Sequence, residues 1–293
     1  MSTPRLLAVS DLHVRYPDNR AITADLRPTG DGDWLIVAGD VAEQVDDVAW
    51  ALGLLRSRFE RVIWVPGNHE LWTRTGDPVS LRGVARYDRL VQIGRELGVD
   101  TPEDEFPVWT GAGGPAVVAP LFLLFDYTFL PDGTTTSEEG LAAAYAAGVV
   151  CADEHVLFPD PYPDRAAWCR ARVETSRRRL DALDPALPTV LVNHWPLTRF
   201  PTRVLRHPEF ALWCGTTATA DWHVRYRATA VVYGHLHIPR VTVEDGVRFV
   251  ESSLGYPREW RARAEQGRVV ALPRQILPAP APDAPAAPGT TTT

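Results

Sequence analysis

The sequence predicts a layered α/β fold, and two observations lead to this class. Short apolar runs recur along the chain, and most of them are continuous instead of alternating with polar residues. Continuous runs are typical of strands that are covered on both faces. Residues 44–58, between the second and third runs, carry apolar side chains at helical spacing: Val45, Val48, Leu52 and Leu55. A strand, a helix and a second strand in succession form the repeating unit of such a fold.

The individual elements follow from these patterns in chain order. Strands are expected where an apolar run is closed by polar or glycine residues: at 5–9, 34–38, 62–65, 189–192 and 228–233. Two further strands, 240–244 and 247–251, flank Asp245-Gly246, which is a hairpin signal.

Helices are expected in three places: 44–58, 78–97 and the arginine-rich stretch 165–183. The second has Pro78 near its first turn and ends near Gly98, which are the usual start and stop signals. A further apolar run at 116–124 lies between the last two helices.

Length and composition indicate one main domain. With 293 residues and 45% hydrophobic side chains, the chain has enough apolar surface for a well-buried core. We expect a domain over residues 1–277, with a less regular insertion at about 71–188. Residues 278–293 form a tail rich in Pro, Ala and Thr, which we expect to be disordered because it has too little apolar surface to offset its ordering entropy.

The charge, the N-terminal segment and the cysteines limit the location and the partners. A net charge of -7 argues against a general affinity for nucleic acid or for anionic membranes. The apolar segment before Asp11 is too short for a signal peptide or a membrane-spanning helix. The three cysteines are odd in number and form no C-x-x-C pair, which fits reduced thiols better than disulfides. We therefore expect a soluble cytoplasmic protein.

Five apolar runs end in side chains that could bind metal ions. These side chains are Asp11, His13, Asp40, Asn68, His69, His194, His235 and His237. In open α/β sheets, sites form beyond the carboxyl ends of the strands, so residues far apart in sequence can meet in one cleft. Carboxylate, carboxamide oxygen and imidazole suit a pair of borderline divalent cations such as Mn, Fe or Zn. A carboxylate can bridge two ions, and Asp40 is the natural candidate.

Structural roles for these histidines are the alternative. A lone Asp-x-His often occurs by chance, whereas Gly67-Asn68-His69-Glu70 and Gly234-His235-Leu236-His237 are more specific. In an extended backbone, His235 and His237 would share one face, Leu236 would face the core, and Gly234 would let the backbone turn. Core histidines without a function would not be expected to collect at strand ends. The remaining histidines lie in no motif and are taken as surface or structural residues: His155, His207 and His223.

Taken in order, the motifs resemble those of the calcineurin-like metallophosphoesterase superfamily. They are Asp-x-His, Gly-Asp, Gly-Asn-His-Glu, Asn-His and Gly-His-x-His, and they span residues 11 to 237. The resemblance implies a four-layer αββα sandwich with a two-metal centre between the sheets. It implies that one metal is held by Asp11, His13, Asp40 and His237. The other would be held by Asp40, Asn68, His194 and His235.

The resemblance also implies catalytic roles. A hydroxide that bridges two metal ions would attack the phosphorus atom of a phosphodiester. His69 would act as the general acid at the leaving-group oxygen. Glu43, three residues after Asp40, stands where relatives have an acidic residue that orients this histidine. It is a glutamate in place of the aspartate of the phosphatase branch.

A closer resemblance covers nearly the whole chain. Segments 65–72, 212–217 and 255–260 are similar to an actinobacterial subgroup that includes phosphopantetheinyl hydrolases. This implies removal of 4′-phosphopantetheine from holo-acyl carrier protein, the expected partner. The alternative within enzymes is a phosphodiesterase or phosphatase of a nucleotide or another small metabolite. A non-catalytic metal-binding scaffold is disfavoured, because every ligand position and His69 are present.

Carrier proteins are acidic, so an acidic enzyme needs a local positive surface to bind one. Two arginine groups are candidates: Arg170, Arg172, Arg177, Arg178 and Arg179, or Arg258, Arg261 and Arg263. An arginine-rich helix is, however, more often a solvated outer face. Four aromatic residues near the motifs could wall a pocket for a pantetheine arm, although core packing explains them equally well: Trp72, Tyr127, Trp195 and Trp213.

Overall fold

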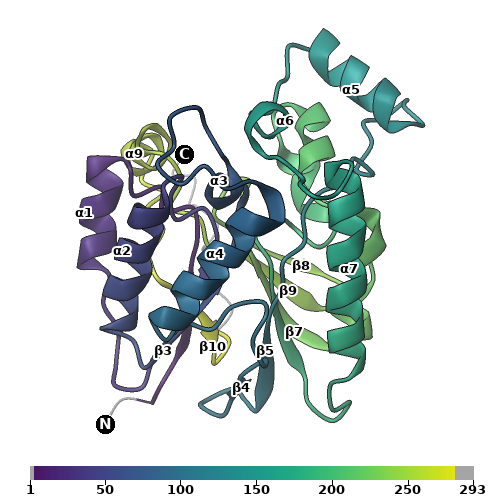
Figure 1. Cartoon of the computed structure of the whole chain (residues 1–293). Helices are drawn as coiled ribbons and strands as arrows, with labels where there is room; N and C mark the ends of the chain where they lie inside the picture. The colour runs from purple at the N-terminus through teal and green to yellow at the C-terminus, as the bar shows by residue number, and fades with distance from the viewer. Residues whose placement is uncertain (1–2, 281–293) are drawn as a thin grey trace, which may run out of the picture.

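The computed structural model describes residues 3–280 and folds them into two β-sheets with helices on their outer faces (Figure 1). One sheet has the strand order β10-β1-β2-β3. Its strands are β1 (Leu6–Val9), β2 (Trp34–Ala38), β3 (Arg61–Val65) and β10 (Arg274–Leu277). The other sheet has the order β4-β5-β6-β7-β9-β8. Its strands are β4 (Val108–Trp109), β5 (Ala116–Pro120), β6 (Thr189–Val192), β7 (Ala228–Tyr233), β8 (Val241–Glu244) and β9 (Val247–Glu251).

The strands predicted from apolar runs are all present, and most of them are parallel to their neighbours. β1, β2 and β3 run parallel in the first sheet, and β5, β6, β7 and β9 do so in the second. The hairpin of β8 and β9 turns at Asp245 and Gly246, which both have positive φ as a tight hairpin turn requires. The predicted α/β class is confirmed.

Alternating residues of each strand pack in different layers. Leu6 and Ala8 of β1 belong to a core cluster that also contains Val190 of β6, so this cluster lies between the two sheets. Leu7 and Val9 belong to a separate cluster with residues of the outer helices. Both faces of these strands are therefore buried, which explains why their apolar runs are continuous.

Helices cover the outer face of each sheet (Figure 1). α1 (Pro17–Asp25), α2 (Val45–Arg56) and α4 (Gly83–Glu96) pack on the first sheet. α7 (Arg165–Asp181) and α8 (Trp222–Arg225) pack on the second. The remaining helical segments are α3 (Asn68–Leu71), α5 (Ser137–Ala146), α6 (Asp153–Val156), α9 (Pro257–Glu265), and the 3-10 turns η1 (Phe200–Val204), η2 (Pro208–Trp213) and η3 (Thr217–Thr219). The order helix, sheet, sheet, helix is the predicted four-layer sandwich.

Residues 71–188, expected as an insertion, contribute to these layers. They supply α4 to the first sheet, and β4, β5 and α7 to the second. Only the part around α5 and α6 lies beyond the layers, where α5 projects at the upper right of Figure 1. The tail expected at 278–293 lies outside the described residues from position 281 onwards.

The helix predicted at 78–97 begins only at Gly83, so its predicted start is wrong. Pro78 lies instead in the loop that precedes it. The fully buried Arg86 holds this loop by donating to Asp77 Oδ2 and to the carbonyl of Val79, each at 3.0 Å. A tertiary contact from the helix interior thus keeps the preceding residues out of the helix.

The structure bears on two further expectations. Cys151, Cys169 and Cys214 are free and buried, as expected. Among the described residues, no helix combines the length and the apolar composition needed to cross a membrane.

Candidate metal centre

The carboxyl ends of five parallel strands meet at one edge of the sandwich. Asp11 and His13 follow β1, Asp40 follows β2, and Asn68 and His69 begin α3 directly after β3. His194 follows β6 in the other sheet, and His235 and His237 follow β7. Every residue predicted for the metal site therefore lies where the two sheets meet.

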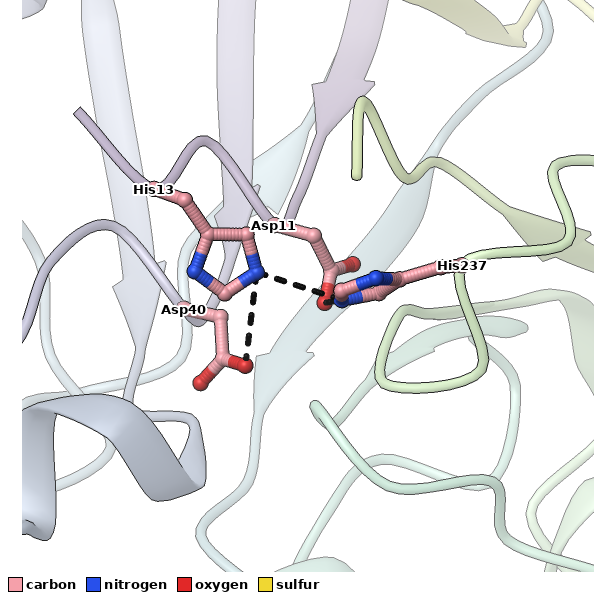
Figure 2. A group of neighbouring side chains, drawn as sticks. All are labelled: Asp11, His13, Asp40 and His237. Atoms are coloured by element: carbon pink, nitrogen blue, oxygen red, sulfur yellow. Dashed lines mark hydrogen bonds and ion pairs between the residues drawn. The ribbon is translucent and has the colours of Figure 1, made fainter. Parts of the chain in front are cut away.

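One group of four side chains encloses a small volume. Asp11, His13, Asp40 and His237 each offer one ligand atom, and these atoms lie within 4.8 Å of one another (Figure 2). His237 Nε2 is 3.1 Å from Asp11 Oδ1 and 3.1 Å from His13 Nε2. His13 Nε2 is 3.9 Å from Asp40 Oδ2. Two imidazole nitrogens and two carboxylate oxygens around one point are a donor set suited to a borderline divalent cation.

A second group adjoins the first and shares Asp40 with it. Asp40 Oδ2 is 3.5 Å from His194 Nε2. Asn68 Oδ1 is 3.2 Å from His194 Nε2 and 3.2 Å from His235 Nδ1. His235 therefore faces this group and His237 the other, as the resemblance implies. Asp40 lies between the two groups, in the position predicted for a bridging carboxylate.

The backbone at these residues is unusual. Asp11, His13, Asp40, His235 and His237 have φ values of 54°, 43°, 55°, 69° and 56°. Non-glycine residues are uncommon in this left-handed region, and such conformations cluster at functional sites. The expectation that His235 and His237 share a face through an extended backbone is therefore wrong. Left-handed turns after the strand place these side chains instead.

Gly234 also has a different role from the one expected. Its φ is not positive, so it does not supply a left-handed turn. A Cβ atom at this position would lie 2.3 Å from Asp11 Oδ2 and 2.5 Å from Ser10 Oγ. Glycine is required because the chain passes this close to the Asp11 carboxylate. Leu236 packs in the core cluster of the second sheet, as expected.

Outer hydrogen bonds orient the imidazoles and the amide. His194 Nδ1 donates to the carbonyl of Ala38 at 2.8 Å, which turns Nε2 toward Asp40. His237 Nδ1 is 2.7 Å from Glu259 Oε2, and Asn68 Nδ2 donates to Asp153 Oδ1 at 2.9 Å. Such outer partners are typical of metal-binding histidines. Glu259 and Asp153 are not among the residues predicted from the sequence, although Glu259 lies in the segment 255–260 that carries the closer resemblance.

The local charges leave Asp40 and His235 in the forms that bind cations, whereas His194 without a metal ion is protonated and would release its proton when an ion binds. Burial by itself raises the pKa of Asp40, but the nearby His194 and His69 outweigh it, and the net pKa lies well below the ordinary value. Burial lowers the pKa of His194, yet Asp40 raises it to about 9. Burial and the charge of His194 lower the pKa of His235 to about 3. Asp40 is therefore ionised and His235 neutral at pH 7, and these are the forms that coordinate metals.

His69 lies at the rim of the cluster. Its Nε2 is 3.8 Å from Asp40 Oδ2 and 3.2 Å from the hydroxyl of Tyr256. Its ring packs on Trp72, with the ring centroids 3.6 Å apart. Glu43 Oε1 is 3.5 Å from His69 Nδ1, which is an ion-pair distance but long for a hydrogen bond. Glu43 thus lies beside His69 as predicted.

Glu43 does not serve His69 alone. Its carboxylate also pairs with Arg15 at 2.9 Å and with Arg74 at 3.1 Å. Burial alone would raise the pKa of Glu43, but His69 and the two arginines lower it overall. The carboxylate is therefore ionised. It lies between His69 and the basic surface that Arg15 and Arg74 form at the mouth of the site.

A cavity of about 320 Å³ opens over the cluster and has two unlike walls. The polar wall consists of candidate ligands and their neighbours: Asp40, Asn68, His69, His235, His237, Tyr256 and Glu259. The apolar wall consists of Val150, Cys151, Leu205, Phe210 and Leu236. Of the four aromatic residues considered for a pocket, Trp72 lines this cavity; Tyr127 and Trp213 bind Glu154 instead, and Trp195 is fully buried.

Most arginines considered for docking have internal partners. Arg172 pairs with Glu103 at 2.6 Å, and Arg177 pairs with Glu174 and Asp181, each at 2.9 Å. Arg179 and Arg263 donate to backbone carbonyls. The arginine-rich helix α7 is therefore largely engaged in holding its own surroundings together.

Comparison with known proteins decides the family. Residues 4–239 match the family described as calcineurin-like phosphoesterase. The chain belongs to this family. It is also 57% identical, over 277 residues, to the [acyl-carrier-protein] phosphodiesterase PptH of Mycobacterium tuberculosis, with 94% of this chain and 84% of the relative covered. The crystal structure of phosphopantetheinyl hydrolase (PptH) from Mycobacterium tuberculosis matches with a TM-score of 0.91 and 56% identity, over 96% of this chain and 99% of that chain.

Calcineurin-like phosphoesterase membership confirms the predicted fold and reaction class. The protein is a metal-dependent phosphoric ester hydrolase. The family uses a dinuclear divalent metal centre, and the buried nitrogen and oxygen donors around Asp40 fit such a centre. Which residues bind each ion stays a prediction.

Proposed function

We propose that this phosphoesterase hydrolyses the phosphodiester of holo-acyl carrier protein and releases 4′-phosphopantetheine and the apo-protein. The observation that carries the proposal is the mixed lining of the cavity, which combines candidate metal ligands with the apolar wall. A phosphodiester with a long, partly apolar arm can place its phosphoryl group at the ligands and its arm along the apolar residues. The relative that is 57% identical is named for the same substrate.

In this proposal, two divalent ions, Mn or Fe, are held by the predicted ligand groups. When bound, such ions supply Lewis acidity and offset the negative charge of the phosphoryl group. Carboxylate, carboxamide and imidazole donors suit Mn and Fe, and Zn is possible with the same donors, whereas the absence of a thiolate from the cluster argues against a structural zinc. Asp40 would hold both ions, since it lies between the two groups.

His69 donates the proton that the leaving serine oxygen needs. Its Nε2 faces the cavity beside Asp40 and Tyr256, which suits a group that protonates an oxygen on a bound phosphoryl group. Glu43 lies at Nδ1 and stabilises the protonated ring. Trp72 covers one face of the imidazole and fixes its plane.

The pantetheine arm lies along the apolar wall. Val150 is 70% exposed although it lines the cavity, and it is joined there by Leu205 and Phe210. Covering such exposed apolar side chains is favourable, and the geminal methyl groups of pantetheine are suited to do so. A small phosphate monoester would leave this wall uncovered.

The carrier protein binds at the mouth of the site. Arg15 and Arg74 have side chains that are 60% and 49% exposed, and both lie beside Glu43 next to the catalytic cavity. Because the two guanidinium groups share one Glu43 carboxylate, a net positive charge remains that would attract the acidic surface of a carrier protein. The cytoplasm is the proposed location, because all three cysteines are free thiols.

Intact mass spectrometry tests the proposal. Holo-acyl carrier protein, incubated with the enzyme and Mn, should lose the mass of one phosphopantetheine group. The positive control is hydrolysis of bis(p-nitrophenyl) phosphate by the same preparation. If several carrier proteins keep their mass while the control substrate is cleaved, the substrate proposal fails. Nucleotides and other small phosphorylated metabolites are then the next substrates to assay.

A further inference from the structure

Asp153 is a buried carboxylate outside every motif, and it contacts the site from behind. It belongs to α6, in the part of the chain that lies beyond the four layers. Its Oδ1 accepts hydrogen bonds from Asn68 Nδ2 at 2.9 Å and from Trp72 Nε1 at 2.7 Å.

The backbone holds Asp153 firmly in place. Trp72 forms an antiparallel bridge with Leu157, and the Thr73 amide donates to the carbonyl of Val156 at 2.9 Å. These bonds join the segment after α3 to the end of α6. Because Asn68 and His69 form the start of α3, the carboxylate of Asp153 has a fixed position relative to both.

The contact with Asn68 selects one of two orientations of its amide. In the observed orientation, Oδ1 faces His194 Nε2 and His235 Nδ1, each at 3.2 Å. A flipped amide would turn its NH₂ group toward the same point, and an NH₂ group cannot bind a cation. A carboxylate offers only acceptors, so Asp153 excludes the flipped orientation.

We propose that Asp153 is a positioning residue that locks the Asn68 amide with Oδ1 toward the second group of metal ligands. This role rests on the proposed two-metal centre. The same carboxylate oxygen fixes the indole of Trp72, whose ring packs on His69. Asp153 therefore connects one metal ligand and the surroundings of the general acid through a single acceptor.

Two substitutions separate this role from simple packing. Asp153→Asn keeps an acceptor oxygen, which the two donors from Asn68 and Trp72 would hold in place. Asp153→Leu has a similar size but offers no acceptor, so the Asn68 amide becomes free to flip. Asp153 Oδ2 has no hydrogen-bond partner among residues 3–280, so the asparagine variant breaks no bond there.

Calorimetric titration of metal-free protein with Mn tests the proposal. Wild type should bind two ions, and Asp153→Asn should resemble it. Asp153→Leu should keep one binding event and lose about 10- to 100-fold in affinity at the other, as expected for loss of an outer partner of a ligand. Two unchanged binding events in Asp153→Leu would overturn the proposal.

Circular dichroism and thermal melting of the metal-free variants monitor folding. If Asp153→Leu does not fold, Asp153→Ala tests the same point, because it removes the acceptor without adding bulk. Trp72→Phe is the matched control, since it removes the indole N–H but leaves the Asn68 contact, and it should bind both ions. If wild type itself binds fewer than two ions, the metal centre and the role of Asp153 both fail.

Discussion

Single residues at the site combine strained backbone with tight local bonding. Asp11, His13 and Asp40 have left-handed φ values, and each such residue costs roughly 1–3 kcal/mol. Backbone hydrogen bonds hold these turns together, among them Asp11 N to the carbonyl of Gly39 at 2.9 Å and His13 N to the carbonyl of Asp40 at 3.0 Å. The strain is thus maintained by bonds between neighbouring strand ends, which also bring the ligand atoms together.

The proposed roles of His69 and Asp40 predict different losses on different substrates. His69→Ala should lower kcat on holo-acyl carrier protein by roughly 10²- to 10⁴-fold, because a serine oxygen needs a proton to leave. The loss on bis(p-nitrophenyl) phosphate should be smaller, because p-nitrophenolate leaves without protonation. Asp40→Asn should abolish both activities, because this carboxylate lies in both ligand groups.

Steady-state kinetics of His69→Ala and Asp40→Asn on both substrates checks these predictions. Manganese titration of His69→Ala serves as the control, and it should give the wild-type number of bound ions. An equal loss on the two substrates in His69→Ala would contradict the general-acid role. Wild-type turnover in Asp40→Asn would contradict the ligand assignment.

At the scale of elements, the sequence predicted those whose patterns are local. The central strands and the residues at their ends were found because both faces of these strands are buried, so their runs are continuous. β10 was missed because it pairs with β1 only from the far end of the chain. Asp153, which contacts Asn68, and Tyr256, which contacts His69, were missed because neither directly follows a strand, the position at which the other site residues were recognised. The sequence pattern does not indicate such tertiary contacts.

A prediction at the scale of elements concerns the loop segments whose apolar side chains line the cavity. Val150, just before α6, lines the cavity and is 70% exposed, so Val150→Ser should leave folding unchanged. It should raise the KM for holo-acyl carrier protein several-fold, because less apolar surface is then covered by the pantetheine arm. The KM for bis(p-nitrophenyl) phosphate should stay close to wild type.

Val243→Ser is the matched control, because Val243 is 60% exposed on β8 and does not line this cavity. It should behave as wild type on both substrates. If Val150→Ser and Val243→Ser give the same KM for the carrier protein, the arm does not lie along the proposed wall.

In the molecule as a whole, buried carboxylates collect at the end of the sandwich that carries the site. Glu70 accepts from the amides of Asp40 and Val41, each at 2.9 Å, and Glu251 accepts from the amide of Ile238 at 2.7 Å. These bonds hold the loops that carry the candidate ligands. Burial raises the pKa of both Glu70 and Glu251 to about 7. Because both groups ionise more readily in the unfolded chain, burying them lowers the stability of the fold near neutral pH.

The raised pKa of Glu251 should make the free energy of unfolding depend on pH. Its pKa is about 7 in the folded protein against the ordinary value of 4.5, so the folded state binds this proton more tightly than the unfolded state. The free energy of unfolding should therefore fall as pH rises through this window, by roughly 3 kcal/mol in total, and level off above it. Glu251→Gln cannot ionise and keeps an acceptor oxygen for Ile238, so it should lack this contribution. Urea unfolding of both proteins without metal, between about pH 5 and pH 8, checks it. Glu70 is common to both, so equal losses of stability would show that Glu251 does not ionise in this range.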